Sequence, residues 1–496
     1  MRDVQSVVRQ GRLARVLAFV IATGLLTAAC TTGSGGGRSG SALAPTSTTT
    51  AKAGVGGAPD RHASAAPAPR VTGPVAGPSG MASPVDLAAK DYVEDEFFLS
   101  GDASAYAKDG DWGRDGKWKA TPTRTAAYTT RVLVRRPSAP TKFNGTVVVE
   151  WFNVTGGLDA SPDFGYMQDE LLRSGYIWVG VSAQALGVTA TVRGNPTRYK
   201  DLSHPGDAFA YDIYTQAARA VRAGALFGRD YRVKAVLATG DSQSAILLTT
   251  YVNAVDPLVK VYDGFLVHSR FAIAGGLGDG TAGPNPAEIR DDTEVPVLVE
   301  LSETDIGFNL GTRQPDSTRF RLWEMAGTAH ADQYLLNLYA PPTPGQPASN
   351  PLGCAKPLNS ANQHWVLKAA LSHLNSWVRG GPPPPTSPRI KMTDANPAVI
   401  ARDENGIAIG GIRLPELEAP TATLSGASSP GSPGFCIFFG STTPFDAAHL
   451  AQLYPDHEAY VTKYSAAVDR LLAAGFILAP DAEAAKSAAR AASVGL

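Results

Sequence analysis

From about Val85 onward, short runs of β-branched and aliphatic residues alternate with stretches of helical spacing. Short runs that are apolar throughout are typical of parallel strands buried on both faces. The segments between them place apolar residues three or four positions apart, as in Asp207–Arg222. This alternation predicts an α/β protein with a mostly parallel central sheet flanked by helices. The predicted strands are Arg131–Val134, Thr146–Trp151, Tyr176–Val181, Val233–Thr239, Val261–Val267, Val297–Leu301 and Arg319–Glu324.

Two later segments predict helices. Asn362–Arg379 has helical spacing and is followed by two glycines and four prolines, which end a helix. Tyr454–Leu478 repeats the apolar spacing, so we expect it to pack on the core as part of a C-terminal extension.

The N-terminal segment has the pattern of an export signal. Three arginines between Arg9 and Arg15 precede an apolar run that starts at Val16 and closes at Thr27-Ala28-Ala29-Cys30. A spanning helix needs ~20 apolar residues, and this run is shorter, which favours a signal peptide over an uncleaved anchor. We therefore predict a signal peptide over residues 1–29 and lipidation of Cys30, so that the mature protein is an exported lipoprotein anchored to the membrane.

Composition divides the rest of the chain. Residues 30–85 are dominated by Gly, Ser, Ala, Thr and Pro, which bury too little apolar surface to fold, so a disordered tether is predicted there. Residues 86–490 are predicted to form one folded domain. The 44 basic and 45 acidic residues nearly cancel, which speaks against nucleic acid as a partner.

Cysteine usage agrees with export. Once Cys30 is set aside, only Cys354 and Cys436 remain, and an even pair in an oxidising compartment favours a disulfide over a metal site. Two separate buried thiols are the alternative. The aromatic stretch Phe435–Phe439 beside Cys436 is predicted to pack in the core.

The sharpest chemical signal follows the Val233–Thr239 run. There Gly240-Asp241-Ser242-Gln243-Ser244 leads into a helical pattern, and a nucleophile elbow needs small residues two places before and after its serine. Gly240 and Ser244 meet that requirement, although the general consensus has glycine at the second position. Ser242 is therefore the candidate nucleophile, and a simple helix-capping turn is the alternative.

Partners for Ser242 follow in the order that an α/β-hydrolase requires, which is nucleophile, acid and then histidine. Asp305 comes shortly after the predicted strand Val297–Leu301, and Glu303 is the competing acid. His330 lies in a loop after Arg319–Glu324 and is the candidate general base.

An oxyanion hole needs backbone N–H groups from the residue after the nucleophile and from a loop after an early strand. Gln243 is the first candidate donor. Val154 or Asn153, in the glycine-containing loop after Thr146–Trp151, is the second.

These residues resemble a poorly characterised family named only as α/β-hydrolase domain proteins. The similarity lies in Val149–Gly157, Gly175–Gln184, Gly240–Ala245, Ser302–Asp305, Trp323–Asp332 and Gly410–Pro415. It implies an α/β-hydrolase fold with a family-specific C-terminal extension and a serine esterase activity, with Ser242, Glu303 or Asp305, and His330 at the matching positions. It implies no particular substrate.

The sequence thus predicts an exported serine hydrolase that cleaves a small-molecule or lipid carboxylic ester through an acyl-enzyme, with no metal or organic cofactor. Peptidase or thioesterase activity on the same triad is an alternative, because only the pocket distinguishes these substrates. A surface binding protein that has kept the fold without turnover is another. The oligomeric state is not predicted.

Overall fold

The computed structural model describes residues 68–278, 283–342, 350–395, 398–428, 432 and 434–495. The predicted signal peptide, Cys30 and most of the predicted tether lie outside the described residues. Within the described part of the chain, no helix is both long enough and apolar enough to cross a membrane.

A nine-stranded sheet forms the centre of the described domain, with strands in the order β1-β2-β3-β5-β4-β6-β7-β8-β9. The strands from β5 to β9 are parallel, whereas β1, β2 and β3 are antiparallel to their neighbours. This confirms the predicted α/β-hydrolase architecture. The strands are β1 Arg70–Thr72, β2 Tyr92–Asp109, β3 Lys119–Pro137, β4 Thr146–Trp151, β5 Ile177–Val181, β6 Ala235–Asp241, β7 Gly264–His268, β8 Val297–Ser302 and β9 Phe320–Met325.

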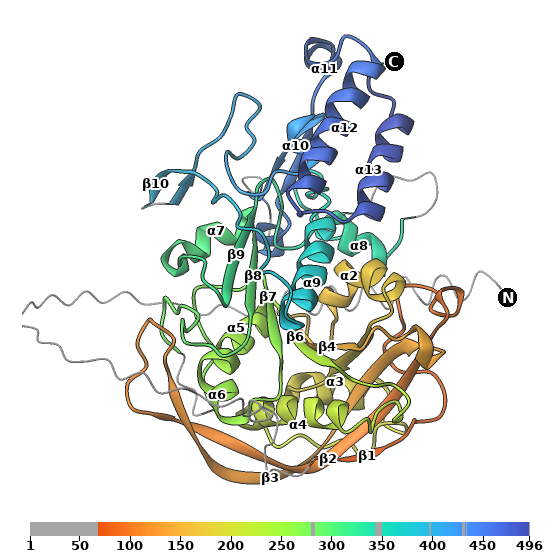
Figure 1. The fold of residues 1–496 in the computed structure, drawn as a ribbon, viewed down its shortest axis with the longest axis vertical. Helices are drawn as coiled ribbons and strands as arrows, with labels where there is room; N and C mark the ends of the chain where they lie inside the picture. The colour runs from red at the N-terminus through yellow and green to blue at the C-terminus, as the bar shows by residue number, and fades with distance from the viewer. Residues whose placement is uncertain are drawn as a thin grey trace, which may run out of the picture. The chain divides into compact units, whose positions relative to one another are not determined.

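Helices cover the parallel strands, which are buried throughout as their apolar sequences require. Helices α2 and α9 pack against each other and against β6, as Figure 1 shows, while α4 contacts β2, β4 and β6. The helices that accompany the central sheet are α2 Pro162–Arg173, α3 Ala185–Gly194, α4 Ala210–Arg222, α5 Gln243–Thr250, α6 Asp256–Val259, α7 Glu303–Asn309, α8 Gln333–Tyr339 and α9 His364–Val378.

The long hairpin of β2 and β3 differs from the prediction, which had only a short first strand at Arg131–Val134. That run is the inner half of β3, and the remainder of the hairpin runs beneath α4 (Figure 1). Its polar groups bind α4, since the backbone N–H of Ser104 donates to Asp212 over 2.8 Å and the Tyr128 hydroxyl donates to Gln216 over 2.8 Å. These partners explain a strand without a continuous apolar run.

The predicted tether extends too far toward the C-terminus. Strand β1 lies within its last part and pairs with Phe98–Ser100 of β2. Arg198 reaches the carbonyl groups of Val75 and Gly77 and also contacts Glu96, which fixes the chain after β1. Composition misplaced this boundary because the residues are ordered by distant partners and not by apolar surface of their own.

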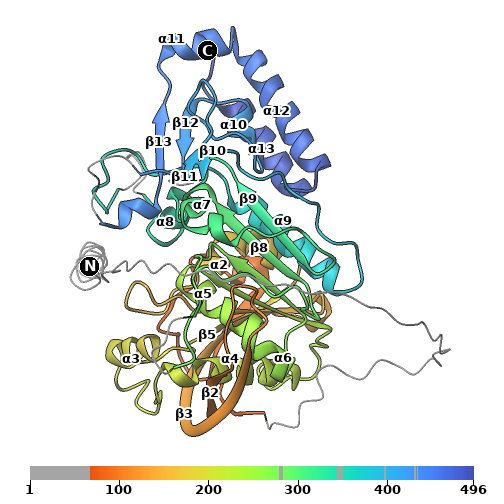
Figure 2. The same cartoon turned by 90° about the vertical axis from the view of Figure 1, so that its left-hand side faces the viewer.

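The C-terminal extension after α9 contains two small hairpins and a group of helices. Figure 2 shows α12 and α13 side by side, and Tyr460, Tyr464 and Val468 of α12 join the main core, which confirms the predicted packing of this segment. The elements are β10 Met392–Ala395, β11 Ala398–Ile400, α10 Pro415–Glu418, β12 Ala422–Ser425, the 3-10 helix η6 Gly434–Phe438, β13 Ser441–Pro444, α11 Ala447–Leu453, α12 His457–Ala473 and α13 Ala479–Ala491.

Candidate active site

Ser242 stands on a tight turn between β6 and α5, at the carboxyl edge of the sheet. Its backbone has φ 57° and ψ −116°, a combination that non-glycine residues rarely adopt. Its N–H donates to the carbonyl of His268 at the end of β7, over 3.1 Å. The neighbouring strand therefore helps to hold a strained turn that presents the Ser242 hydroxyl.

Ser244 takes the place where the general consensus has glycine, and its hydroxyl closes the turn. It accepts from the N–H of Asp241 over 3.0 Å and donates to the carbonyl of the same residue over 2.8 Å. Space is also limited on the Gly240 side of the turn, because a Cβ on Gly240 would lie 3.2 Å from Ser244 backbone atoms. Ser244 thus fits in place of glycine because it is small and because its hydroxyl forms hydrogen bonds with backbone groups of Asp241 that glycine could not form.

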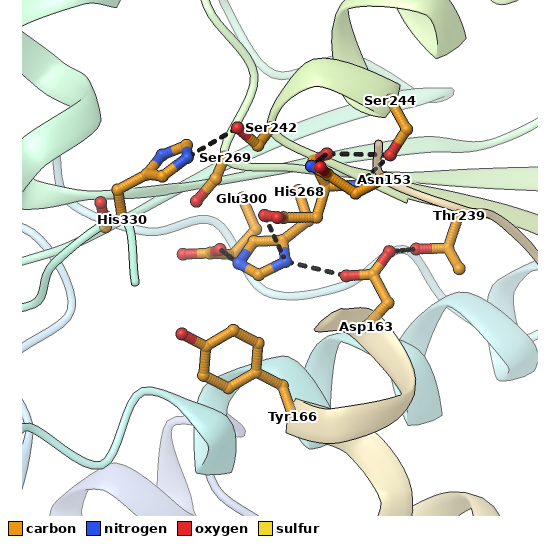
Figure 3. Close-up of polar contacts among 12 residues, drawn as sticks. Asn153, Asp163, Tyr166, Thr239, Ser242, Ser244, His268, Ser269, Glu300 and His330 are labelled. Carbon is orange, nitrogen blue, oxygen red and sulfur yellow. Dashed lines mark hydrogen bonds and ion pairs between the residues drawn. The ribbon is translucent and has the colours of Figure 1, made fainter. Parts of the chain in front are cut away.

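The structure brings Ser242, His330 and Asp305 together, as Figure 3 shows for the serine and the histidine. The His330 Nε2 atom lies 2.7 Å from the Ser242 Oγ, and the Nδ1 atom lies 2.6 Å from Asp305 Oδ1. His330 follows β9 and Asp305 lies in the first turn of α7 after β8. Parallel strands end at the same edge of the sheet, which is why three distant segments meet here.

The second carboxylate oxygen of Asp305 is held by three donors. The Ser302 N–H, the Ser302 hydroxyl and the Ser269 hydroxyl reach Oδ2 over 2.8, 2.7 and 2.8 Å. Burial by itself would raise the pKa of Asp305, but the nearby His330 and these hydroxyl donors outweigh it and lower the pKa below its ordinary value. Asp305 is thus a fixed anion facing the imidazole.

Glu303, the competing acid, faces away from this site. Its Oε1 accepts from Arg402 over 2.7 Å and from the N–H of Gly426 over 3.0 Å, while Oε2 accepts from the N–H of Gly327 over 2.7 Å. Two of these partners belong to the C-terminal extension. The geometry therefore assigns Glu303 to the attachment of the extension and leaves Asp305 as the acid beside His330.

The candidate oxyanion donors differ in how free they are. Gln243 is the first residue of α5, where a backbone N–H has no partner inside the helix. The N–H of Val154 points toward the elbow, where it donates to the side-chain oxygen of Gln243 over 3.4 Å. The N–H of Asn153 is already bonded to Ala160 over 3.0 Å, and its side chain donates to the carbonyl of Asp241 over 3.0 Å. The Val154 bond is longer than the Asn153 bond and ends on a side chain, so Val154 and Gln243 remain the candidate donors, whereas Asn153 fastens the loop to the elbow.

Cys354 and Cys436 form a disulfide with a Cα–Cα distance of 5.7 Å. In the adjoining aromatic stretch, Phe439 packs against the small core cluster around the two cysteines as predicted, whereas Phe435 and Phe438 do not join the core. The ring of Phe438 lies 5.0 Å from the His330 imidazole, measured between centroids, and only partly buried rings surround it. Its backbone explains the placement, because the Phe438 carbonyl accepts from the N–H of Ala331 over 2.9 Å and so follows the histidine loop.

A second feature that sequence reasoning missed is a buried group of ionisable side chains beneath the elbow, visible in Figure 3. His268 Nδ1 lies 2.8 Å from Asp163 and 3.3 Å from Asp241, and its Nε2 lies 3.3 Å from Glu300. Burial, together with neighbouring carboxylates, raises the pKa of both Asp241 and Glu300. Acidic residues at or near the ends of three buried strands, Glu150 in β4, Asp241 in β6 and Glu300 in β8, were the available signal.

Among the residues that the structure describes, no group of three or more His, Cys, Asp or Glu side chains is arranged to hold a metal ion. What the site offers is a strained serine hydroxyl bonded to an imidazole, an imidazole bonded to a buried carboxylate, and two N–H groups beside them. This is the arrangement that activates a hydroxyl as a nucleophile.

Comparison with known proteins adds the following. The model of a family described as alpha/beta hydrolase domain matches residues 62–487. No curated protein is significantly similar in sequence. Solved structures with a similar fold include an esterase from Rhizomucor miehei, with 12% identity over 57% of this chain and 84% of that one and a TM-score of 0.31.

Two further structures are at a similar level. An alpha-beta serine hydrolase homologue from Coxiella burnetii has 12% identity over 41% of this chain and 84% of that one, with a TM-score of 0.27. A lipase/esterase from Lactobacillus plantarum has 11% identity over 37% and 78%, with a TM-score of 0.25. Likeness this distant carries no information about substrate.

Proposed function

Because this chain belongs to the alpha/beta hydrolase domain family, we propose that it is a serine hydrolase that cleaves carboxylic esters at Ser242. The observation that carries the proposal is the continuous series of hydrogen bonds from Ser242 through His330 to Asp305. A binding protein without turnover has no need for a strained serine bonded to a histidine, so this geometry supports catalysis over a binding role.

In the acylation step, His330 Nε2 takes the proton of the Ser242 hydroxyl while Oγ attacks the ester carbonyl carbon. The negative charge on the carbonyl oxygen is stabilised by the N–H groups of Gln243 and Val154. The protonated His330, paired with the Asp305 carboxylate, then gives its proton to the alcohol oxygen as the bond between carbonyl carbon and that oxygen breaks. The alcohol leaves, and Ser242 carries the acyl group.

In the deacylation step, His330 removes a proton from water, whose oxygen attacks the acyl carbon through a second tetrahedral intermediate. Collapse of that intermediate returns the proton to Ser242 Oγ and releases the carboxylic acid. Apart from the one water consumed in deacylation, both steps use only groups of this chain: Ser242, His330, Asp305 and two backbone amides.

The cellular setting is part of the proposal. The arginine-rich start, the short apolar run and Cys30 support export and lipid attachment, and the disulfide between Cys354 and Cys436 suits an oxidising compartment. Radioactive palmitate should label the full chain in growing cells and should not label a Cys30→Ser variant. Equal labelling of both would contradict an anchor at Cys30.

The decisive experiment is labelling of the purified full chain with a fluorophosphonate probe, in which Ser242 Oγ bonds to phosphorus and fluoride leaves. Wild type is expected to be labelled, and a Ser242→Ala variant with an unchanged melting temperature is expected to lose all labelling. Ser138→Ala removes an exposed serine far from the site and serves as the matched control. Labelling that survives in Ser242→Ala, or none in wild type, would contradict the proposal.

A panel of ester, thioester and amide substrates that share one acyl group then separates the alternatives. The proposal expects the ester to be cleaved with the highest kcat/KM. A higher value for the thioester or the amide would show that the same triad acts mainly on that class of substrate.

A further inference from the structure

Two aromatic rings, Phe271 and Phe438, lie against the candidate general base, and Phe308 and Phe435 pack on them; we refer to the four rings as the aromatic wall. Ring centroids of Phe271 and Phe438 lie 5.4 and 5.0 Å from that of His330. Phe308 lies 5.5 Å from Phe271, and Phe435 lies 6.2 Å from Phe438. The rings come from the segment after β7, from α7 and from η6.

None of these rings belongs to the hydrophobic core. All four are at least partly accessible, and Phe308 is 46% exposed, although large apolar side chains lower the free energy of folding most when they are fully buried. Accessible aromatic rings beside a reactive histidine form a surface on which the burial of an apolar ligand lowers the free energy.

The wall is held in place from both sides. The Phe438 carbonyl accepts from Ala331, and the disulfide at Cys436 ties η6 to Cys354. On the other side, the carbonyl of Arg270, which precedes Phe271, accepts from the side chain of Asn309. A wall fixed in this way is preorganised, so a ligand need not first order it.

The chemistry of the site determines which part of a substrate meets the wall. His330 must deliver its proton to the leaving alcohol oxygen, so that oxygen lies within reach of Nε2 and its substituent extends past the imidazole. Figure 3 shows Asn153, in the loop that also carries the donor Val154, on the opposite side of Ser242 from His330. The wall therefore borders the alcohol moiety and not the carbonyl oxygen.

We propose that the aromatic wall is a subsite for the alcohol moiety, and that the natural substrates are carboxylic esters of apolar alcohols, aromatic or long-chain. This rests on the proposed function of Ser242. Specificity accordingly lies on the alcohol side of the ester, where an apolar group is covered by Phe271, Phe308 and Phe438 while the acid product leaves from the serine.

The test measures kcat/KM of the full chain by acid release for methyl, butyl, benzyl and 2-phenylethyl butyrate. Benzyl alcohol and methanol have similar acidity, so the benzyl-to-methyl ratio reports binding and not leaving-group reactivity. We expect that ratio to exceed ~10 in wild type, because each methylene that fills an apolar pocket contributes a factor of roughly 10 or more.

Phe308→Ala and Phe438→Ala should each lower the benzyl-to-methyl ratio by about 10-fold, because the benzyl ester loses a ring to pack against and the methyl ester does not. Phe445→Ala is the matched control, since that ring also stacks on a histidine, His449, at 4.2 Å but lies outside the wall. It should leave the ratio unchanged.

Fluorophosphonate labelling separates a subsite from a mere support for His330, because the leaving fluoride places nothing against the wall. A subsite predicts that the benzyl ester slows about 10-fold more than labelling does in Phe308→Ala and Phe438→Ala. If labelling and every ester slowed together, the rings would only position His330 and the inference would be wrong. A flat alcohol series in a labelled, active wild type would also overturn it, whereas an unlabelled wild type would contradict the proposed function itself.

Discussion

Two acids, Glu303 and Asp305, stand two residues apart on the first turn of α7, and their neutral variants should fail in opposite ways. In Asp305→Asn, three donors from Ser302 and Ser269 still converge on one position, and the Ser302 N–H cannot turn away. The amide oxygen is therefore drawn to that side, and the amide NH2 faces His330. The imidazole must then accept at Nδ1 and carry its proton on Nε2, where it cannot take the proton of Ser242.

The wrong tautomer costs about 10⁴-fold in kcat where the same change has been made in a triad of this kind. Stability should change little, because the hydroxyl donors keep an acceptor. Fluorophosphonate labelling of Asp305→Asn should slow to a similar extent, since the same proton transfer activates the serine.

Glu303→Gln should instead weaken the fold. The carboxylate accepts N–H groups on both oxygens, from Arg402 and Gly426 on one and from Gly327 on the other, beside a longer bond from the Ser425 hydroxyl, so an amide NH2 must face an N–H donor. Breaking a buried ion pair costs 3–5 kcal/mol, and Arg402 is 29% exposed, so we take about 3 kcal/mol. With an unfolding entropy of about 2 cal/mol/K per residue over some 430 residues, this lowers Tm by about 3 °C.

The assay measures kcat per labelled active site beside thermal unfolding for both variants. We expect loss of activity at normal Tm for Asp305→Asn, and lowered Tm at near-normal kcat for Glu303→Gln. A four-decade loss of kcat in Glu303→Gln with an active Asp305→Asn would refute the assignment of the acid.

Two further predictions concern stability. Replacing Cys354 and Cys436 by serine opens a loop with a sequence separation of 82, which should lower the free energy of unfolding by at most about 4.5 kcal/mol; reduced wild type should match the double variant by calorimetry. Burial raises the pKa of Asp332 to about 7, so between pH 3.8 and about 7 the native state holds a proton that the unfolded chain has lost. Relative to Asp332→Asn, the free energy of unfolding of the wild type should therefore fall by about 4 kcal/mol as the pH rises through that window. Denaturant unfolding that gives both proteins the same pH dependence would contradict this.

The parts of the site that could be predicted are those tied to buried strands. The runs at Thr146–Trp151 and Val233–Thr239 are apolar because parallel strands are covered on both faces, and the residues after them are fixed at one edge of the sheet. Ser242, Asp305 and His330 follow three such strands, so their order in the chain and their distance from the strand ends were enough to predict that they meet. The two-residue difference between Glu303 and Asp305 is smaller than any periodicity can resolve.

What could not be predicted depends on contacts between distant segments. The aromatic wall owes the position of Phe438 to a bond with Ala331 more than 100 residues earlier and to the disulfide at Cys436. Nothing in the local pattern distinguishes that ring from a core residue. His268 likewise acquires its acidic neighbours only when β6, β7, β8 and α2 meet, and the outer half of the β2–β3 hairpin is a strand because α4 supplies its polar partners.

The attachment of the C-terminal extension has a consequence for catalysis. Thr304, which lies between the two acids, donates its hydroxyl to the carbonyl of Gly426 over 2.6 Å, and a Cβ on Gly426 would come within 2.4 Å of the Thr304 nitrogen. The extension is therefore pressed directly against the turn that holds Asp305. The same extension carries Phe438, whose ring lies 5.0 Å from the His330 imidazole, so it contacts both the turn that holds Asp305 and the histidine. The contacts of the extension are therefore part of the active site. Substitutions that weaken these contacts should alter substrate preference before they unfold the sheet.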